Sequence, residues 1–268
     1  MLSTGVIASH EKPIAQAGLI AKGTVYCILG ILAFMAAFHI RGQSASNTDK
    51  AGVFDFIYKQ PGGQPLLAVV ALGLFSYCIW RGMQAFMDTA NKGSDRSGIA
   101  ARLRYLFSGI VYGSLAVYAV NILLSKGSRS GDKQQGIAEE LLSRPFGQWL
   151  AGIAAAILIG VGVYQIYYGL SEKFKKHVQR AAGSGNRNLL LMAGTIGYLA
   201  RGLVWLIIAW MFSKAAMHSN SAEAGDTSRA FGFLQEIAYG RYILAAVGLG
   251  LICYGAFNFI RARYERFH

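Results

Sequence analysis

A two-part pattern recurs three times along the chain, and each copy contains two apolar segments of membrane-spanning length. The first part is a Gly-x-Val-aromatic motif, which begins at Gly23, Gly109 and Gly202 in the three copies. The second part starts at Gly63, Gly147 or Gly240 and then continues apolar for about twenty residues, the length that a helix needs to cross a bilayer. Because internal repeats decide architecture, the pattern predicts six transmembrane helices arranged as three tandem hairpins.

Composition supports a membrane protein over a soluble helical bundle. Hydrophobic residues make up 54% of the 268 residues and charged residues only 15%, whereas soluble domains carry roughly a quarter charged residues. The first apolar run is too long for the apolar region of a signal peptide, so we expect this helix to be retained. The six apolar windows are 19–39, 64–87, 104–124, 149–170, 192–216 and 241–262.

We therefore expect an all-α membrane protein with a single domain covering residues 1–268. Its three repeats are predicted at 13–88, 100–172 and 193–264. Each hairpin returns to its starting side, so the copies share one orientation and pack most simply around a pseudo-threefold axis; a side-by-side row is the alternative. Each extracytoplasmic connection is predicted to contain a short interfacial helix, at 51–60, 136–144 and 229–238.

The distribution of the net charge of +13 predicts the orientation in the membrane. If both termini lie in the cytoplasm, that side carries 16 of the 26 Lys and Arg residues and 5 of the 13 acidic residues. The positive-inside rule therefore places both termini in the cytoplasm. The predicted partners are anionic lipid headgroups at the cytoplasmic face and, as a further possibility, a membrane protein; nucleic acid is not expected.

Polar residues at matched repeat positions are the strongest functional signal. One set directly precedes the first glycine, and the other follows the second glycine by eighteen residues. The six residues are Lys22, Ser108 and Arg201, and Arg81, Gln165 and Asn258. Charges at membrane depth are costly and often functional. We favour the interpretation that the Lys and Arg side chains snorkel to lipid phosphates; the alternative is a buried binding site for an anion or anionic substrate.

Aromatic residues also match between the repeats, at positions predicted about one helical turn inside the cytoplasmic boundary. They form either an interfacial belt or the lining of a ligand site. These residues are Tyr26, Tyr112 and Trp205 in the first helices, and Trp80, Tyr164 and Phe257 in the second helices.

The sequence carries no recognisable catalytic motif, so we expect no enzyme activity and no cofactor. Zincin, nucleophile-elbow, phosphate-loop and haem-attachment patterns are all missing from the sequence. His39 and His218 occupy matched positions, sixteen residues after their first glycines. Two histidines without a matched carboxylate make only a weak metal candidate, so no metal site is predicted.

The repeat motifs resemble those of the bacterial domain-of-unknown-function family 1206, over residues 13–264. The first motif is clearest as Ala200-Arg201-Gly202-Leu203-Val204-Trp205, and the second as Arg144-Pro145-Phe146-Gly147. Repeat two departs from the pattern at Ser108, and repeat three departs at Ala238. The resemblance implies three two-helix units and a bacterial cytoplasmic (inner) membrane, and it implies no activity.

Two functions are consistent with these patterns. The scarcity of motifs favours a non-enzymatic scaffold or binding protein that contacts lipids or a partner complex. The alternative is a small channel or carrier for an anion or polar small molecule, with Lys22, Arg81 and Arg201 attracting the ligand.

Overall fold

The structure, a computed structural model, describes residues 4–45, 48–125, 147–171, 173–177, 187–218 and 225–264. Within these ranges the chain is helical, with short connections. The long helices are α1 (Thr4–Ala37), α3 (Gly63–Phe86), α4 (Arg96–Leu124), α6 (Gly147–Leu170), α7 (Arg187–His218) and α9 (Gly240–Tyr264). The shorter ones are η1 (Ile40–Gly42), α2 (Lys50–Lys59), η3 (Lys173–His177) and α8 (Thr227–Glu236).

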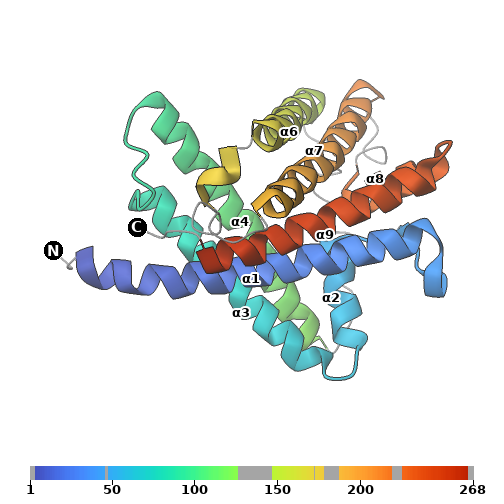
Figure 1. The fold of residues 1–268 in the computed structure, drawn as a ribbon. Helices are drawn as coiled ribbons and strands as arrows, with labels where there is room; N and C mark the ends of the chain where they lie inside the picture. Colours follow the sequence, from blue (N-terminus) through green and yellow to red (C-terminus); the bar gives the residue numbers. More distant parts are fainter. Residues whose placement is uncertain are drawn as a thin grey trace.

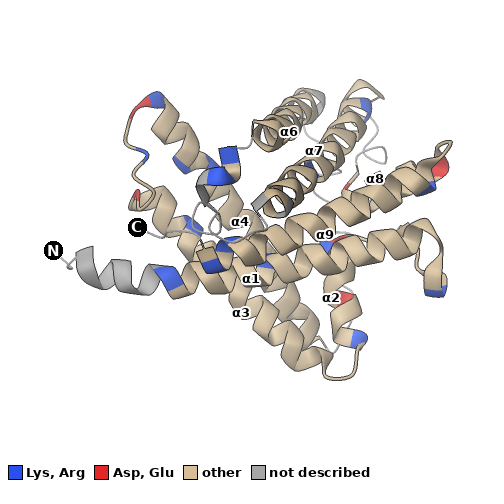
Figure 2. Cartoon of the chain, in the orientation of Figure 1, with Lys and Arg blue, Asp and Glu red and all other residues tan. Residues whose placement is uncertain are grey.

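All six long helices contain a segment long and apolar enough to cross a membrane, which confirms the predicted six-helix membrane fold. None of the 13 acidic residues lies in these segments, and Figure 2 shows the described ones near helix ends and in connections. Three of the helices begin five or more residues before the predicted windows, because polar residues continue the helices beyond the apolar runs. α1, α4 and α7 begin at Thr4, Arg96 and Arg187, where windows opening at 19, 104 and 192 were predicted.

The helices pack in the order α4–α3–α1–α9–α7–α6. α1 and α9 lie side by side and antiparallel through the middle of the bundle (Figure 1); α3 packs on α1 and α4 on α3, while α7 packs on α9 and α6 on α7. Three of these contacts join neighbouring repeats: α3 with α4, α6 with α7, and α9 with α1. The arrangement is therefore a pseudo-threefold ring that is open at one place.

The three contacts between repeats use the same pair of sequence positions. The first glycine of one repeat faces the residue fifteen positions after the second glycine of the neighbouring repeat: Gly23 with Gly255, Gly109 with Cys78, and Gly202 with Gly162. A Cβ on Gly23 would lie 3.0 Å from the Gly255 carbonyl oxygen, and one on Gly202 equally close to that of Gly162. Small residues let helix backbones approach closely in lipid, which explains why the repeat motif begins with glycine.

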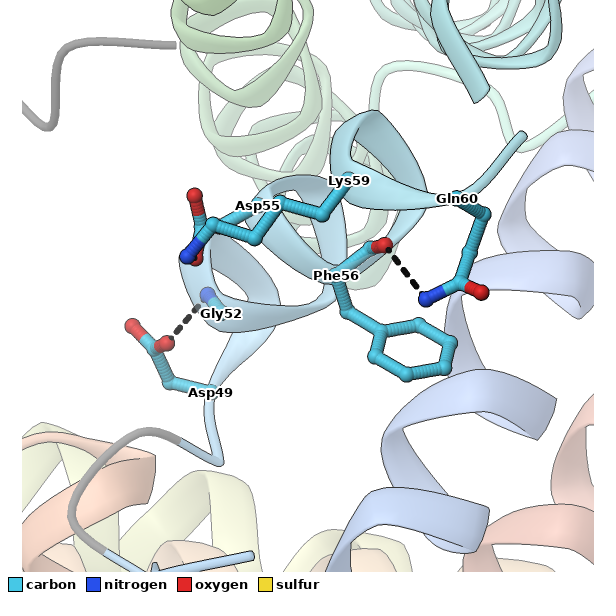
Figure 3. A network of polar contacts seen from close by, with 6 residues as sticks. All are labelled: Asp49, Gly52, Asp55, Phe56, Lys59 and Gln60. Atoms are coloured by element: carbon cyan, nitrogen blue, oxygen red, sulfur yellow. Dashed lines mark hydrogen bonds and ion pairs between the residues drawn. The ribbon is translucent and has the colours of Figure 1, made fainter. Parts of the chain in front are cut away.

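The predicted interfacial helices are present in repeats one and three, as α2 and α8, while 136–144 lies outside the described residues. Asp49 and Asp226 cap them by accepting hydrogen bonds from the backbone N–H of Gly52 and Arg229. Figure 3 shows the Asp49 cap together with the hydrogen bond from the Gln60 side chain to the Phe56 carbonyl. Both helices turn apolar faces into the bundle, burying Phe54, Ile57, Phe231 and Leu234.

Candidate functional site

A lysine is buried in the middle of the bundle among tyrosine rings. Lys22 is 5% exposed, and its Nζ lies 5.1 Å, 5.2 Å and 5.4 Å from the ring centres of Tyr77, Tyr112 and Tyr254. These distances are within the range of cation–π attraction. The ammonium also donates a hydrogen bond to the Tyr77 hydroxyl at 3.3 Å. Four helices therefore meet at this one charge.

Arg201 makes the equivalent arrangement in repeat three. Its Nη1 donates a hydrogen bond to the Tyr254 hydroxyl, and its guanidinium carbon lies 4.3 Å from the Tyr254 ring centre and 5.0 Å from that of Tyr26. Tyr77 and Tyr254 both follow their second glycine by fourteen residues. The cation before the first glycine thus pairs with the same tyrosine position in repeats one and three.

Arg81 joins the cluster through Tyr77. Its Nε and Nη2 donate to the Tyr77 hydroxyl at 2.9 Å and 2.6 Å, and its Nη1 donates to Gln84 Oε1 at 2.6 Å. One phenol oxygen therefore accepts hydrogen bonds from two cationic side chains, Lys22 and Arg81. We call Lys22, Arg81 and Arg201 with Tyr26, Tyr77, Tyr112 and Tyr254 the cation–tyrosine cluster.

A cavity lies against this cluster. It offers about 40 Å³ to the centres of water-sized molecules, which is room for roughly three waters. Lys50 from α2 and Thr227 from α8 are part of its wall, so the cavity lies towards the side of the bundle that carries the short helices. The lining residues are Tyr26, Leu29, Lys50, Arg201, Val204, Trp205, Ile208, Thr227 and Leu251.

The cluster has an excess of positive charge. Lys50 is the second cation in the cavity wall besides Arg201, with Nζ at 5.7 Å from the ring centres of both Tyr26 and Tyr112. No acidic residue lies in the six spans, and the one ion pair among the described residues is the surface pair of Lys59 and Asp55. Arg201 Nε is buried without a hydrogen-bond partner in the described part of the chain. An anion entering the cavity would meet both charge and an unused donor.

The other predicted polar residues lie elsewhere in the bundle. Ser108 is partly buried on α4. Asn258 is fully buried and donates from Nδ2 to the Tyr254 carbonyl at 2.6 Å, and Gln165 is 8% exposed. The side-chain oxygens of Asn258 and Gln165 have no hydrogen-bond partner among the described residues. The structure thus gathers Lys22, Arg81 and Arg201 but does not place all six predicted residues in one ring.

Most of the matched aromatic residues lie inside the bundle. Tyr26, Tyr112, Trp80 and Phe257 are at most 5% exposed, Trp205 is partly buried in the cavity wall, and Tyr164 is 41% exposed. The first helices begin earlier than the predicted windows, so their matched aromatic residues lie several turns from the helix starts. The α1 span starts at Lys12, so Lys22 lies roughly 15 Å along it.

The two matched histidines are not part of the site. His39 is exposed and lies 3.3 Å from Gln235 Nε2 of α8, through its Nε2. Among the described residues, no three His, Cys, Asp or Glu side chains gather where they could hold a metal ion.

Sequence reasoning missed three residues of the site. Tyr77 and Tyr254 had a detectable signal, because they match each other between repeats one and three while Val161 takes their place in repeat two. Lys50 had no such signal, because it belongs to a connection whose length differs between the repeats.

The fold and this site define a multi-pass helical membrane protein of three like-oriented hairpins around a buried cationic centre. The chain belongs to the family described as Domain of Unknown Function (DUF1206), whose model matches residues 17–88, 103–172 and 196–265. It is 31% identical over 260 residues to the Bacillus subtilis (strain 168) protein named "Uncharacterized protein YxxB", covering 95% of this chain and 91% of that protein. No solved structure matches the chain.

Proposed function

We propose that the protein binds a small anion in the central cavity, without catalysing a reaction. The observation that carries the proposal is the convergence of Lys22, Arg201 and Lys50 around tyrosine rings in spans that contain no acidic residue. Taking charges out of water costs several kcal/mol per ion, and a bound anion offsets that cost. The tyrosine hydroxyls and the free Arg201 Nε supply hydrogen bonds to such a ligand.

This geometry favours ligand binding over the scaffold role that motif scarcity had favoured. A scaffold whose matched cations bind lipid phosphates needs these side chains on the outer surface of the bundle. Lys22 and Arg201 instead contact tyrosine rings inside the bundle. The proposed setting is a bacterial cytoplasmic membrane with both termini in the cytoplasm, supported by the charge distribution of the connections. In this proposed orientation the ligand enters from the extracytoplasmic side, which the presence of Lys50 and Thr227 in the cavity wall supports.

Thermal unfolding of the purified protein in a neutral detergent tests the proposal. Chloride, nitrate, formate, phosphate and sulfate are compared as sodium salts at one ionic strength. A ligand that binds only the folded state stabilises it with the logarithm of its concentration above Kd, by about 2.7 kcal/mol at one hundred times its Kd. Lys50→Gln and Arg201→Gln are expected to lose the anion-specific rise in Tm. Arg241→Gln, on the exposed start of α9, is the charge-matched control and is expected to keep it.

The proposal fails if no anion raises the Tm of the wild type more than that of Arg201→Gln. Where binding is found, an anion-flux assay in liposomes separates a carrier or channel from a binding protein. Flux that disappears in Arg201→Gln and persists in Arg241→Gln indicates transport through the site.

A further inference from the structure

The hairpin of repeat two is open, and its sequence explains why. In repeats one and three, a glycine five residues before the first glycine lets the two helices of the hairpin touch. A Cβ on Gly18 would lie 2.7 Å from the Cα of Tyr77, and one on Gly197 would lie 2.7 Å from the Cα of Tyr254. Repeat two has Arg104 at this position. α4 and α6 accordingly do not pack along their described lengths, although the Arg104 side chain of α4 reaches Tyr164 of α6.

A second matched position shows the same difference. Ten residues after the second glycine, Gly73 and Gly250 are buried against Ala21 and Ala200 of their own hairpins. Ile157 occupies this position in repeat two and is 57% exposed. On the facing helix, Phe107 replaces Ala21 and Ala200, and it is 59% exposed where they are 5% and 9% exposed. We call the region of Leu103, Arg104, Phe107, Ile157 and Tyr164 the repeat-two seam.

The seam is apolar along most of its length and cationic at one end. Arg104 Nη1 donates a hydrogen bond to the Tyr164 hydroxyl at 2.6 Å, and its guanidinium carbon lies 5.2 Å from the Tyr164 ring centre. Tyr167 follows Tyr164 by three residues on the same face of α6. The Lys173 ammonium lies 4.5 Å from the ring centre of Tyr167. Arg104 is eight residues from the start of its helix, roughly 12 Å along the axis.

We propose that the repeat-two seam binds an anionic membrane lipid, with an acyl chain along Leu103, Phe107 and Ile157 and the headgroup phosphate at Arg104. Charge decides the occupant, since Arg104 and Lys173 attract a phosphate or carboxylate and have no acidic residue within ion-pair distance in the described ranges. A guanidinium forms strong paired hydrogen bonds with phosphate. The site is separate from the central cavity and does not depend on the proposed anion binding there.

Lipid retention measured by native mass spectrometry tests the seam. The protein is purified from vesicles of phosphatidylglycerol and phosphatidylcholine in equal amounts and exchanged extensively into detergent. The wild type is expected to retain phosphatidylglycerol selectively. Arg104→Gln is expected to retain about tenfold less, as expected for loss of one charge-assisted contact. Arg96→Gln, at the exposed start of the same helix, is the matched control and is expected to retain as much as the wild type.

A photo-crosslinking residue placed at Phe107 locates the bound chain. After detergent exchange the probe at position 107 is expected to crosslink to lipid. The same probe at Phe75, which is 54% exposed on α3, is expected to give no lipid crosslink, because detergent has replaced the lipid there. Equal retention of the two lipids, or equal retention by wild type and Arg104→Gln, overturns the proposal. Crosslinks from position 107 to residues 126–146 or to a second copy of the chain also overturn it, because the seam then has a protein occupant.

Discussion

Gly18 of α1 lies directly against Tyr77 of α3, so that a Cβ on the glycine would be 2.7 Å from both the Cα and the Cβ of the tyrosine. Tyr77 in turn accepts hydrogen bonds from Lys22 and Arg81. The close approach of the two helices therefore sets the position of the Tyr77 hydroxyl, which accepts the hydrogen bonds of Lys22 and Arg81 in the cation–tyrosine cluster.

Gly18→Ala is expected to separate α1 from α3 and to destabilise the protein by about 1–3 kcal/mol, the usual cost of overpacking. Gly197→Ala is expected to act equally in repeat three, since Gly197 meets Tyr254 in the same way. Unfolding in detergent measures the change. Gly160→Ala is the control, because a Cβ there has no neighbour within 4 Å in the described structure. Equal melting of Gly18→Ala and Gly160→Ala would contradict the packing argument.

Repeat comparison explains how much of the fold was predictable. The six helices and the short helices α2 and α8 follow from matched apolar positions, which reflect packing constraints repeated three times. The matched polar positions identified Lys22 and Arg201 but did not specify that they face inward. The open hairpin of repeat two also had a signal in the sequence, because Arg104 occupies the repeat position that is glycine in Gly18 and Gly197. The convergence of Lys22 with Tyr112 and Tyr254 was not predictable, because it depends on contacts between repeats that sequence spacing does not specify.

Tyr77→Phe is expected to destabilise the protein by about 1.5–3 kcal/mol, the range for hydrogen bonds to charged groups. The substitution keeps the ring and removes the oxygen that accepts from Lys22 and Arg81. Tyr58→Phe is the matched control, because the Tyr58 hydroxyl accepts an exposed hydrogen bond from the uncharged Gln64 side chain at 3.3 Å. Chemical unfolding in detergent compares the two variants. A Tyr77→Phe protein as stable as Tyr58→Phe would show that the phenol oxygen does not matter to the fold.

Lys22→Met is expected to leave the Tm unchanged or to raise it, while the anion-specific stabilisation disappears. Taking a charge out of water costs several kcal/mol per ion and methionine avoids that cost; Lys22 is buried without a carboxylate partner in the described structure. Thermal unfolding with and without the stabilising anion separates the two effects. A large fall in Tm accompanied by intact anion stabilisation would assign Lys22 a purely structural role.

The connection between α3 and α4 is expected to lose stability in acid. Hydrogen bonds from the backbone N–H groups of Lys92 and Gly93 hold the pKa of the Asp88 carboxyl below its ordinary value. A carboxyl whose pKa is lowered by folding stabilises the folded state above its unfolded pKa, about 3.9, and this contribution is lost as the pH falls through the lower folded value. Amide exchange at Lys92 and Gly93 is therefore expected to lose protection below about pH 4. Asp88→Asn should remove this pH dependence, and an unchanged profile in that variant would contradict the assignment.

Thiol labelling tests the orientation on which ligand access depends. The three native cysteines, Cys27, Cys78 and Cys253, are all partly buried and are first replaced by alanine. Ser94→Cys, exposed between α3 and α4, is then expected to react only after the membrane is opened, and Gln60→Cys, exposed after α2, is expected to react in intact cells. The positive-inside rule gives this result because the connection at Ser94 belongs to the more basic side. The reverse labelling pattern would move the cavity mouth at Lys50 to the cytoplasm, and the ligand would then have to come from inside the cell.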